Sequence, residues 1–313
     1  MNAVPQQYVS TARARDTVQE SYLSASVTNP FAGLLPGTSF NGTTVPRSQL
    51  LRRYPEFGLV ALETYDGSST YHAAQFKVER RFKSGHSLVT TFTYSKMRDR
   101  TVYLNAFDAA PEDRVSPDDR PRRFTLAGIY ELPFGRGRKW GSNWSGIVNA
   151  VLGGWQTTGN FQYQAGQPLT WGHIYYDAGL NPQDLVSEVG KKVNGQIMGF
   201  DIPAWTTTGF YFPDAQGNIA DTRIALGTAN ARYFPTTIAS VRYPSLYLLD
   251  AGITKNFRLP HNQRLQIRIE AINALNNQVL WTPDVSPRSG TFGLFTSLRN
   301  NPRDLQLGIK WTF

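Results

Sequence analysis

The densest group of ionisable side chains lies in the segment FDAAPEDRVSPDDRPRR, residues 107–123, with its five acids Asp108, Glu112, Asp113, Asp118 and Asp119. Carboxylate oxygens in a loop are the ligands that Ca²⁺ prefers. The spacing does not match an EF-hand loop, however, and arginines are interleaved among the acids. The sequence therefore favours a loop whose acids are solvated, or paired with its own arginines, over a calcium site.

A second candidate is FGRGRKWG, residues 134–141, which combines glycines with cations but lacks the Gly-Lys-Ser/Thr ending of a phosphate-binding loop. A basic turn near anionic headgroups is the better interpretation. The four histidines, His72, His86, His173 and His261, show no metal-ligand spacing. No serine stands in a nucleophile-elbow context. We therefore predict no enzymatic activity, no metal site and no cofactor.

The amino-acid composition limits the fold classes to which this chain can belong. Among 313 residues there are 18 Phe, 15 Tyr, 7 Trp, 27 Gly and 19 Pro, a balance typical of many strands joined by turns. The absence of cysteine excludes disulfides and thiolate metal sites. The net charge of +9 fits either an anionic partner, such as nucleic acid or a phosphate-bearing membrane surface, or simply a mildly basic surface. We rank nucleic-acid binding last, because the cations are dispersed.

No apolar run approaches the roughly 18 residues that a membrane-spanning helix needs, and the first 20 residues lack the apolar centre of a signal peptide. Apolar and polar residues instead alternate with period two, most clearly in residues 264–275. The same alternation predicts strands at 71–82, 87–98, 122–133, 154–165, 246–257, 264–275 and 303–313.

The connections between these strands alternate in length. Residues 83–86 and 258–263 are tight turns, whereas 99–121, 166–245 and 276–302 are long, and 134–153 is intermediate. Strands of about ten residues with short periplasmic turns and long extracellular loops are typical of outer-membrane barrels. Rings at strand ends are expected to form interfacial girdles; they are Tyr94, Tyr130, Trp171, Trp281 and Trp311. We therefore predict an all-β fold, a partial antiparallel transmembrane β-barrel over residues 71–313, with an apolar face toward lipid and a polar face toward a lumen. Residues 1–70 are expected to form an irregular extracellular loop region, and 166–245 a long extracellular loop.

Aromatic residues in this long loop are the weak candidates for ligand binding. They are Trp205, Phe210, Tyr211, Tyr233 and Phe234. Rings often hold sugars and peptides, but a loop of this length also needs rings for its own packing, and both interpretations stay open.

Several stretches resemble a known family: NPFAGLLPG, QLLRRYPEF, YHAAQFKVERRFKSGHSLVTTFTYSK, RRFTLAGIYELPFGRGR, GGWQTTGNFQYQAGQPL, LDAGITKNFRL, RLQIRIEAINALNN and NPRDLQLGIKWTF. In order and spacing they are similar to the C-terminal part of TonB-dependent outer-membrane receptors, in particular the Oar-like receptors of acidobacteria. The resemblance implies a barrel of about 22 strands closed by a plug. It also implies nutrient uptake (of siderophore, saccharide or peptide class) driven by TonB, and location in the bacterial outer membrane.

The same resemblance implies partners. Leu305, Leu307, Ile309, Trp311 and Phe313 look like the assembly signal that the barrel-assembly machinery reads. Outer-membrane lipid and lipopolysaccharide would contact the apolar face, while TonB and the plug would act through N-terminal parts outside this sequence. Seven strands leave open edges in a bilayer, so this chain is either a fragment of a longer receptor or a degenerate piece of one, and we favour the fragment. The alternative is a soluble or surface-attached β-sandwich, a binding or adhesion module in which the apolar faces of 264–275 and 303–313 pack on each other.

Overall fold

The computed structural model describes residues 2–12, 16–58, 65–81, 86–176, 192–193, 196–197, 199, 224–226, 229–261, 263–286, 289, 291 and 293–313. Its long strands are β3 (Ser68–Arg81), β4 (Ser87–Arg100), β6 (Arg122–Glu131), β7 (Trp155–Gln164), β14 (Leu246–Arg258), β15 (Arg264–Ile272) and β16 (Asp304–Thr312). The short strands are β1 (Ser26–Thr28), β2 (Thr44–Pro46), β5 (Arg114–Val115), β8 (Pro168–Thr170), β9 (Ile174–Tyr176), β10 (Lys192–Val193), β11 (Gln196–Ile197), β12 (Ile224–Leu226) and β13 (Thr237–Arg242). The helices are η1 (Gln6–Tyr8), α1 (Thr17–Ser24), α2 (Arg47–Leu50) and α3 (Gly146–Leu152).

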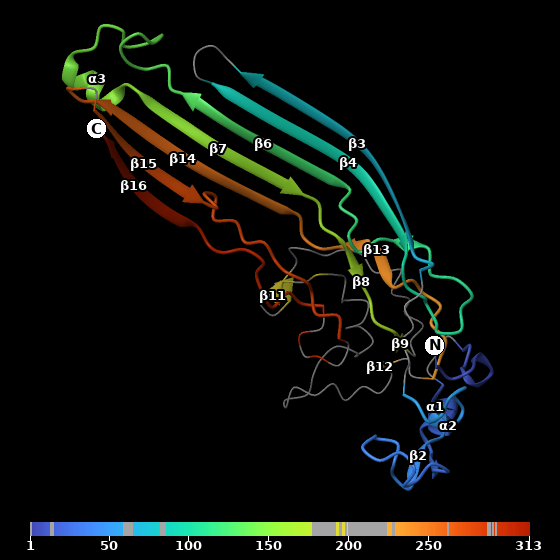
Figure 1. Cartoon of the computed structure of the whole chain (residues 1–313). Coiled ribbons are helices and arrows are strands. Elements are labelled where there is room, and N and C mark those ends of the chain that lie inside the picture. The colour runs from blue at the N-terminus through green and yellow to red at the C-terminus, as the bar shows by residue number, and fades with distance from the viewer. Residues whose placement is uncertain are drawn as a thin grey trace.

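The seven long strands form one antiparallel sheet in the order β16-β15-β14-β7-β6-β4-β3, and β5 adds to β4. All seven strands predicted from the alternation are confirmed, with ends displaced by at most three residues. Figure 1 shows a single curved sheet whose outer strands, β3 and β16, lie far apart. The structure is thus an open segment of antiparallel sheet, and it does not close into a barrel by itself.

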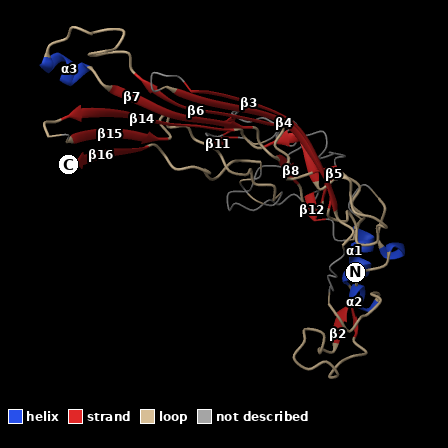
Figure 2. Cartoon of the chain, turned by 45° about the horizontal axis from the view of Figure 1, so that its top comes forward, coloured by secondary structure: helices blue, strands red, loops and turns tan. Residues whose placement is uncertain are grey.

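Because successive long strands are antiparallel, the sheet has two different ends. At the turn end, β3 leads to β4, β6 to β7 and β14 to β15, and β16 finishes there; α3 also lies at this end (Figures 1 and 2). At the loop end lie the three long connections, 101–121, 165–245 and 273–303. The intermediate connection around 134–153 therefore belongs to the turn end, and it is long because it contains a helix.

The strand register sorts the side chains onto two faces, because directly paired residues point to the same side. Leu307 is paired with Ile269, which is paired with Ile253, and Phe76 is paired with Phe92, which is paired with Phe124. These residues define the apolar face, and its side chains are solvent-exposed in the isolated chain: Leu307 by 70% and Phe76 by 64%. The opposite, polar face carries the neighbours in sequence: Gln75, Lys77, Thr91, Thr125, Asn160, Gln162, Gln266, Arg268, Gln306 and Lys310.

Aromatic side chains border the apolar face at both ends. Tyr130, Trp155, Phe257 and Trp311 lie near the turn end, and Tyr94, Tyr163 and Tyr247 near the loop end. Rings at such positions are typical of the two interfaces of a bilayer. Trp171, which the sequence suggested as another interfacial ring, is instead buried, with 3% exposure.

The buried apolar core lies at the loop end and not in the sheet. Strand β8 pairs with β13, and Leu169, Phe234, Ile238 and Val241 are the largest fully buried side chains of the described residues. The segment 166–245 is therefore not an open loop in its described parts, since it folds into a packed unit. Before β3, residues 2–58 hold η1, α1, a β1–β2 pair and α2, so this region contains short regular elements.

Two further points bear on the fold class. Strands β15 and β16 are hydrogen-bonded neighbours in one sheet, so their apolar sides face the same way and cannot pack on each other as the sandwich alternative requires. Within the described part of the chain, no helix has the length and apolar character needed to cross a membrane.

Candidate functional site

The first functional surface is the apolar face itself. A contiguous exposed apolar surface of this kind is a contact site for a partner or a membrane, because water solvates it poorly. It spans strands of nine to 14 residues. About nine to 11 residues suffice for a strand to cross a bilayer. This face can therefore meet hydrocarbon along the whole bilayer thickness.

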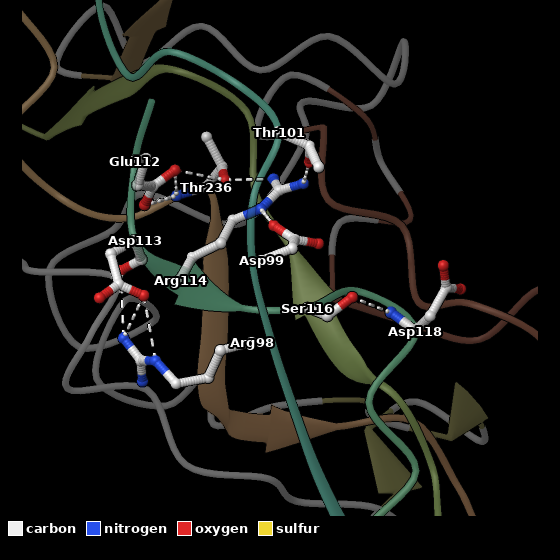
Figure 3. A network of polar contacts seen from close by, with 9 residues as sticks. All are labelled: Arg98, Asp99, Thr101, Glu112, Asp113, Arg114, Ser116, Asp118 and Thr236. Carbon is white, nitrogen blue, oxygen red and sulfur yellow. Dashed lines mark hydrogen bonds and ion pairs between the residues drawn. The ribbon is translucent and has the colours of Figure 1, made fainter. Parts of the chain in front are cut away.

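The second candidate site is the loop cluster, formed by connections 101–121 and 165–245 where they meet the loop end of the sheet (Figure 3). Thr236 donates from its backbone N to Oε1 of Glu112 (3.0 Å) and from Oγ1 to Oε2 (2.7 Å). Arg114 donates to Oγ1 of Thr236 (2.6 Å) and to Oδ1 of Asp99 (2.8 Å). The Arg114 and Asp99 side chains are only 9% and 8% exposed. Strand β4 is thereby fixed to both connections.

A second buried acid performs the same function closer to the sheet. Asp119 accepts a hydrogen bond from the backbone N of Met97 (2.8 Å) and pairs with Nη2 of Arg242 at 2.7 Å. Arg242 also donates to the carbonyl of Gly166 (3.1 Å). Nearby, burial lowers the pKa of Arg120, whose guanidinium contacts the Gln167 side chain. These bonds join the acidic segment to both ends of the 165–245 connection.

Arg232 joins further parts of the loop cluster, and Asn230 extends the cluster to the N-terminal segment. Its guanidinium donates to the carbonyls of Trp171 (2.7 Å), Phe234 (2.9 Å) and Pro235 (2.8 Å), and its backbone N donates to Oδ1 of Asn105 (2.7 Å). The Asn230 side chain donates to the carbonyl of Ala12, and Asn230 forms an isolated parallel β-bridge with Ser10. Residues far apart in sequence thus form one hydrogen-bonded unit above the sheet.

A third surface, here called the basic band, lies on the apolar side just beyond Tyr94. Strand pairing places His72, Lys96, Arg98, Arg100 and Arg122 on the same side as Tyr94. Arg98 and Arg100 both pair with Asp113, at 3.0 and 3.1 Å, and these hydrogen bonds lower the pKa of that exposed carboxyl.

Two hollows adjoin the basic band. One, of about 360 Å³, is lined by His72, Lys96, Arg98, Arg100 and Asp113 among others. The other, of about 710 Å³, is lined by residues that include Tyr94, Arg122, Arg242 and Tyr247. A hollow with several cations at the edge of an apolar face suits a ligand that joins phosphate to acyl chains.

The acids of segment 107–123 therefore serve mainly as acceptors within the loop cluster. Asp108 accepts from the backbone N of Asn105 (2.7 Å), while Glu112, Asp113 and Asp119 bind the partners given above. In the described ranges, no group of three or more His, Cys, Asp or Glu residues could hold a metal ion.

The candidate ligand-binding rings divide into two groups. Trp205, Phe210 and Tyr211 lie outside the described residues. Tyr233 is 42% exposed at the surface of the loop cluster, whereas Phe234 is 1% exposed and packs against Arg232, whose guanidinium carbon lies 4.5 Å from the ring centre. Phe234 is thus a core residue in this arrangement, whereas the partly exposed Tyr233 ring lies at the surface with its centroid 5.4 Å from that of Phe234.

The residues of the expected assembly signal, by contrast, all point outward. Leu305, Leu307, Ile309, Trp311 and Phe313 are between 60% and 94% exposed.

The basic band was not singled out from the sequence, although the sequence contains a pattern that indicates it. Lys96, Arg98 and Arg100 continue the period-two spacing of Phe92 and Tyr94, so the sequence places cations directly after the apolar part of one face.

Comparison with known families agrees with this architecture. The family model for the outer membrane beta barrel domain matches residues 7–306. Neither a curated protein nor a solved structure matches the chain. The match assigns the protein to the bacterial outer membrane. Residues 7–306 make up nearly the whole sequence, and the chain therefore belongs to the outer membrane beta-barrel domain family.

Proposed function

We propose that this chain is the C-terminal part of a TonB-dependent receptor that takes up a nutrient of the siderophore, saccharide or peptide class. The observation that carries the proposal is the asymmetry of the sheet. One end has compact connections, while the three connections at the other end are long, and the described parts of two of them, 101–121 and 165–245, form the loop cluster. Such a cluster over a polar sheet face is suited to capture a solute before it enters a lumen.

The open edges support a larger barrel. In the described chain, β3 pairs only with β4 and β16 only with β15. Unpaired backbone groups in hydrocarbon cost several kcal/mol each, so further strands must pair with both edges. A receptor barrel of about 22 strands would supply them and enclose a lumen wide enough for a plug. Polar-face residues such as Lys77, Asn160 and Arg268 would then face water or the plug.

Each part of the chain has a role in this mechanism. The loop cluster, with Tyr233 at its surface, would hold the substrate on the extracellular side. The plug, which lies outside this sequence, would be moved by TonB so that the substrate passes along the polar face. The outward side chains of β16 would be read by the barrel-assembly machinery, and the basic band would contact lipopolysaccharide phosphates. No catalysis is part of this mechanism.

The orientation of the sheet can be tested by cysteine labelling, because the chain has no cysteine of its own. Ala109→Cys lies on the exposed surface of the loop cluster, and Ser142→Cys is exposed at the turn end. A membrane-impermeant maleimide should label Ala109→Cys in intact cells, but Ser142→Cys only after the outer membrane is permeabilised. Labelling of Ser142→Cys in intact cells would contradict the proposed orientation.

Receptor function needs a second experiment on the native protein. An antibody against residues 101–121 should detect an outer-membrane protein several-fold heavier than 35.0 kDa. Crosslinking in intact cells should join that protein to TonB. A deletion strain should lose TonB-dependent uptake of one member of a panel of iron siderophores, oligosaccharides and peptides. An unchanged panel together with no TonB crosslink would overturn the proposal, even if the protein lies in the outer membrane.

A further inference from the structure

Helix α3 exposes the side of the helix that a soluble protein would bury. Ile147, Val148, Val151 and Leu152 are exposed by 81%, 39%, 60% and 52%. At about 100° per residue they form one stripe about 140° wide. Asn149 lies off this stripe, and its Oδ1 accepts a hydrogen bond from the backbone N of Arg136 at 2.7 Å. The helix thus directs its polar side chain inward and its apolar stripe outward.

The fold of the surrounding turn enforces this orientation. Gly135 has a φ of +116°, and a Cβ at this position would lie 2.9 Å from Cα of Gly153 and 2.8 Å from Oδ1 of Asn149. Only residues without a side chain allow the two segments to approach so closely. Ser145 caps the helix by accepting from the backbone N of Val148 (3.5 Å). The inward side of α3 is therefore filled by the turn itself, which leaves no room to bury the apolar stripe there.

Two side chains of the apolar face hold the C-terminal end of α3. Nε1 of Trp155 donates to the carbonyl of Val151 (2.9 Å), and Nζ of Lys255 donates to the carbonyl of Gly153. Trp155 is paired with Lys255, which is paired with Ile267, and Ile267 with Ile309, so all four share the lipid-facing side. The apolar stripe is consequently continuous with a surface that is already in contact with lipid.

Lys255 is the single lysine among the apolar-face residues of the described β14, and its surroundings explain its position. The side chain is 3% exposed, and its Nζ lies 5.5 Å from the ring centre of Trp155 and 5.2 Å from that of Phe257. A lysine near the end of a membrane-spanning strand extends its amine toward the interface. Here the amine reaches the carbonyl of Gly153, directly after α3, so the helix lies at the depth of the aromatic side chains at the turn end, among them Trp155 and Phe257.

The same connection carries cations. From Glu131 to Trp155 there are three basic residues, Arg136, Arg138 and Lys139, and one acid, Glu131 itself. Arg138 pairs with Glu131, whereas the Lys139 amine lies 5.2 Å from the ring centre of Trp140, which is 50% exposed. An apolar stripe flanked by cations and tryptophan is the composition of a segment that lies in a membrane interface.

We propose that α3 and the basic turn before it form an interfacial anchor in the lipid leaflet at the turn end. Ile147, Val151 and Leu152 insert among the acyl chains, and Arg136 and Lys139 contact phospholipid phosphates. The identity of that leaflet as the periplasmic one rests on the orientation proposed above. The anchor fixes the depth of the barrel and is independent of what the receptor transports.

The test uses a single environment-sensitive fluorophore in the full-length protein, in isolated outer membranes. It is attached to Ile147→Cys on the stripe, to Ala150→Cys off the stripe, or to Ser142→Cys in the turn. We expect the Ile147 label to be quenched several-fold more by a nitroxide-labelled fatty acid than by iodide, and the Ser142 label to show the reverse. The Ala150 label should lie between them.

Two results would overturn the anchor. Equal iodide quenching at Ile147 and Ser142 would place the stripe in water. A shielded Ile147 label that neither quencher reaches would show that a protein covers the stripe instead of lipid. As a second measurement, Ile147→Asp should lower the folded outer-membrane fraction more than Ala150→Asp does. None of these readouts depends on uptake or on TonB. Labelling of Ser142→Cys in intact cells would assign the anchor to the outer leaflet instead of the periplasmic one, but it would not contradict the contact with lipid.

Discussion

Arg242 in β13 binds Asp119 through a 2.7 Å contact between Nη2 and Oδ2, which joins two connections that are 123 residues apart in sequence. The Asp119 side chain is 3% exposed, and its other oxygen accepts from the backbone N of Met97 in β4. The pair therefore connects the loop cluster to the sheet, with the carboxylate shielded from water and the Arg242 side chain partly solvated, at 29% exposure. A buried carboxylate that accepts from two sides is difficult to replace.

We predict that Asp119→Ala destabilises the loop cluster by about 3–5 kcal/mol, because it leaves the Arg242 guanidinium and a backbone donor partly buried without their acceptor. The measurement is the rate at which an external protease cleaves residues 101–121 in folded protein. Asp113→Ala is the matched control, since its pairs with Arg98 and Arg100 are exposed and should contribute little. Similar cleavage rates in the two variants would contradict the structural role of Asp119.

The two faces of β16 give a second prediction. Leu307 stands on the apolar face, paired with Ile269, and Gln306 on the polar face, paired with Glu270. An arginine at the bilayer midplane costs about 2–4 kcal/mol on the lipid face, whereas lumen positions tolerate charge. Leu307→Arg should therefore reduce the folded, outer-membrane-inserted fraction strongly, and Gln306→Arg should reduce it little. If both arginines were equally tolerated, the face assignment would be wrong.

The seven long strands could be predicted from the sequence. The alternation of apolar and polar residues is a local pattern, and it can be recognised without knowing which strands pair. The residues 264–275 predicted β15, which ends at Ile272, since Asn273 adopts a φ of +51° and its side chain bonds to Asn277 and Asn301. A turn of this kind depends on long-range acceptors. The prediction therefore extended the strand three residues too far.

The loop cluster could not be predicted in the same way. Strands β8 and β13 are three and six residues long, and they pair across the 165–245 connection. Trp171 seemed an interfacial ring from sequence, but its backbone N bonds to Thr236 and its side chain is buried. Such burial is decided by contacts between distant residues and leaves no periodic signal. The strands of the sheet can thus be predicted from local sequence patterns, whereas the loop cluster depends on contacts between distant residues and cannot.

A pH dependence of the loop cluster follows from His173. Burial is the main cause that lowers the pKa of its imidazole below the ordinary value of 6.5; the Asn230 carbonyl, 2.9 Å from Nε2, raises the pKa, and the Arg232 charge lowers it further. Because the folded-state pKa is lowered, the neutral imidazole stabilises the fold above pH 6.5. That contribution is lost as pH falls from there through the folded-state pKa.

We therefore expect protease cleavage of the loop cluster to accelerate as pH falls below about 6.5, over and above the protease's own pH profile. His173→Gln retains a donor toward Asn230 but cannot ionise, so this variant should lose the acceleration. His72→Gln, an exposed histidine on β3, should leave it unchanged. An acceleration that persists in His173→Gln would assign the pH response to another group.

The basic band gives a prediction in which two changes have opposite signs. Asp113 neutralises part of the charge of Arg98 and Arg100, at 3.0 and 3.1 Å, next to the hollow lined by Lys96 and His72. If this band binds lipopolysaccharide phosphates, Asp113→Asn should increase the lipopolysaccharide that copurifies with the folded protein. The double variant Arg98→Gln/Arg100→Gln should decrease it several-fold, and the increase should shrink at high salt. Arg123→Gln is the control on the other face, because strand pairing puts Arg123 beside Thr93 on the polar face. If inorganic phosphate at millimolar concentration displaced the lipid, the band would be a site for free phosphate. If Arg123→Gln removed as much lipid as the double variant, the loss would reflect net charge alone and the basic band would have no specific role.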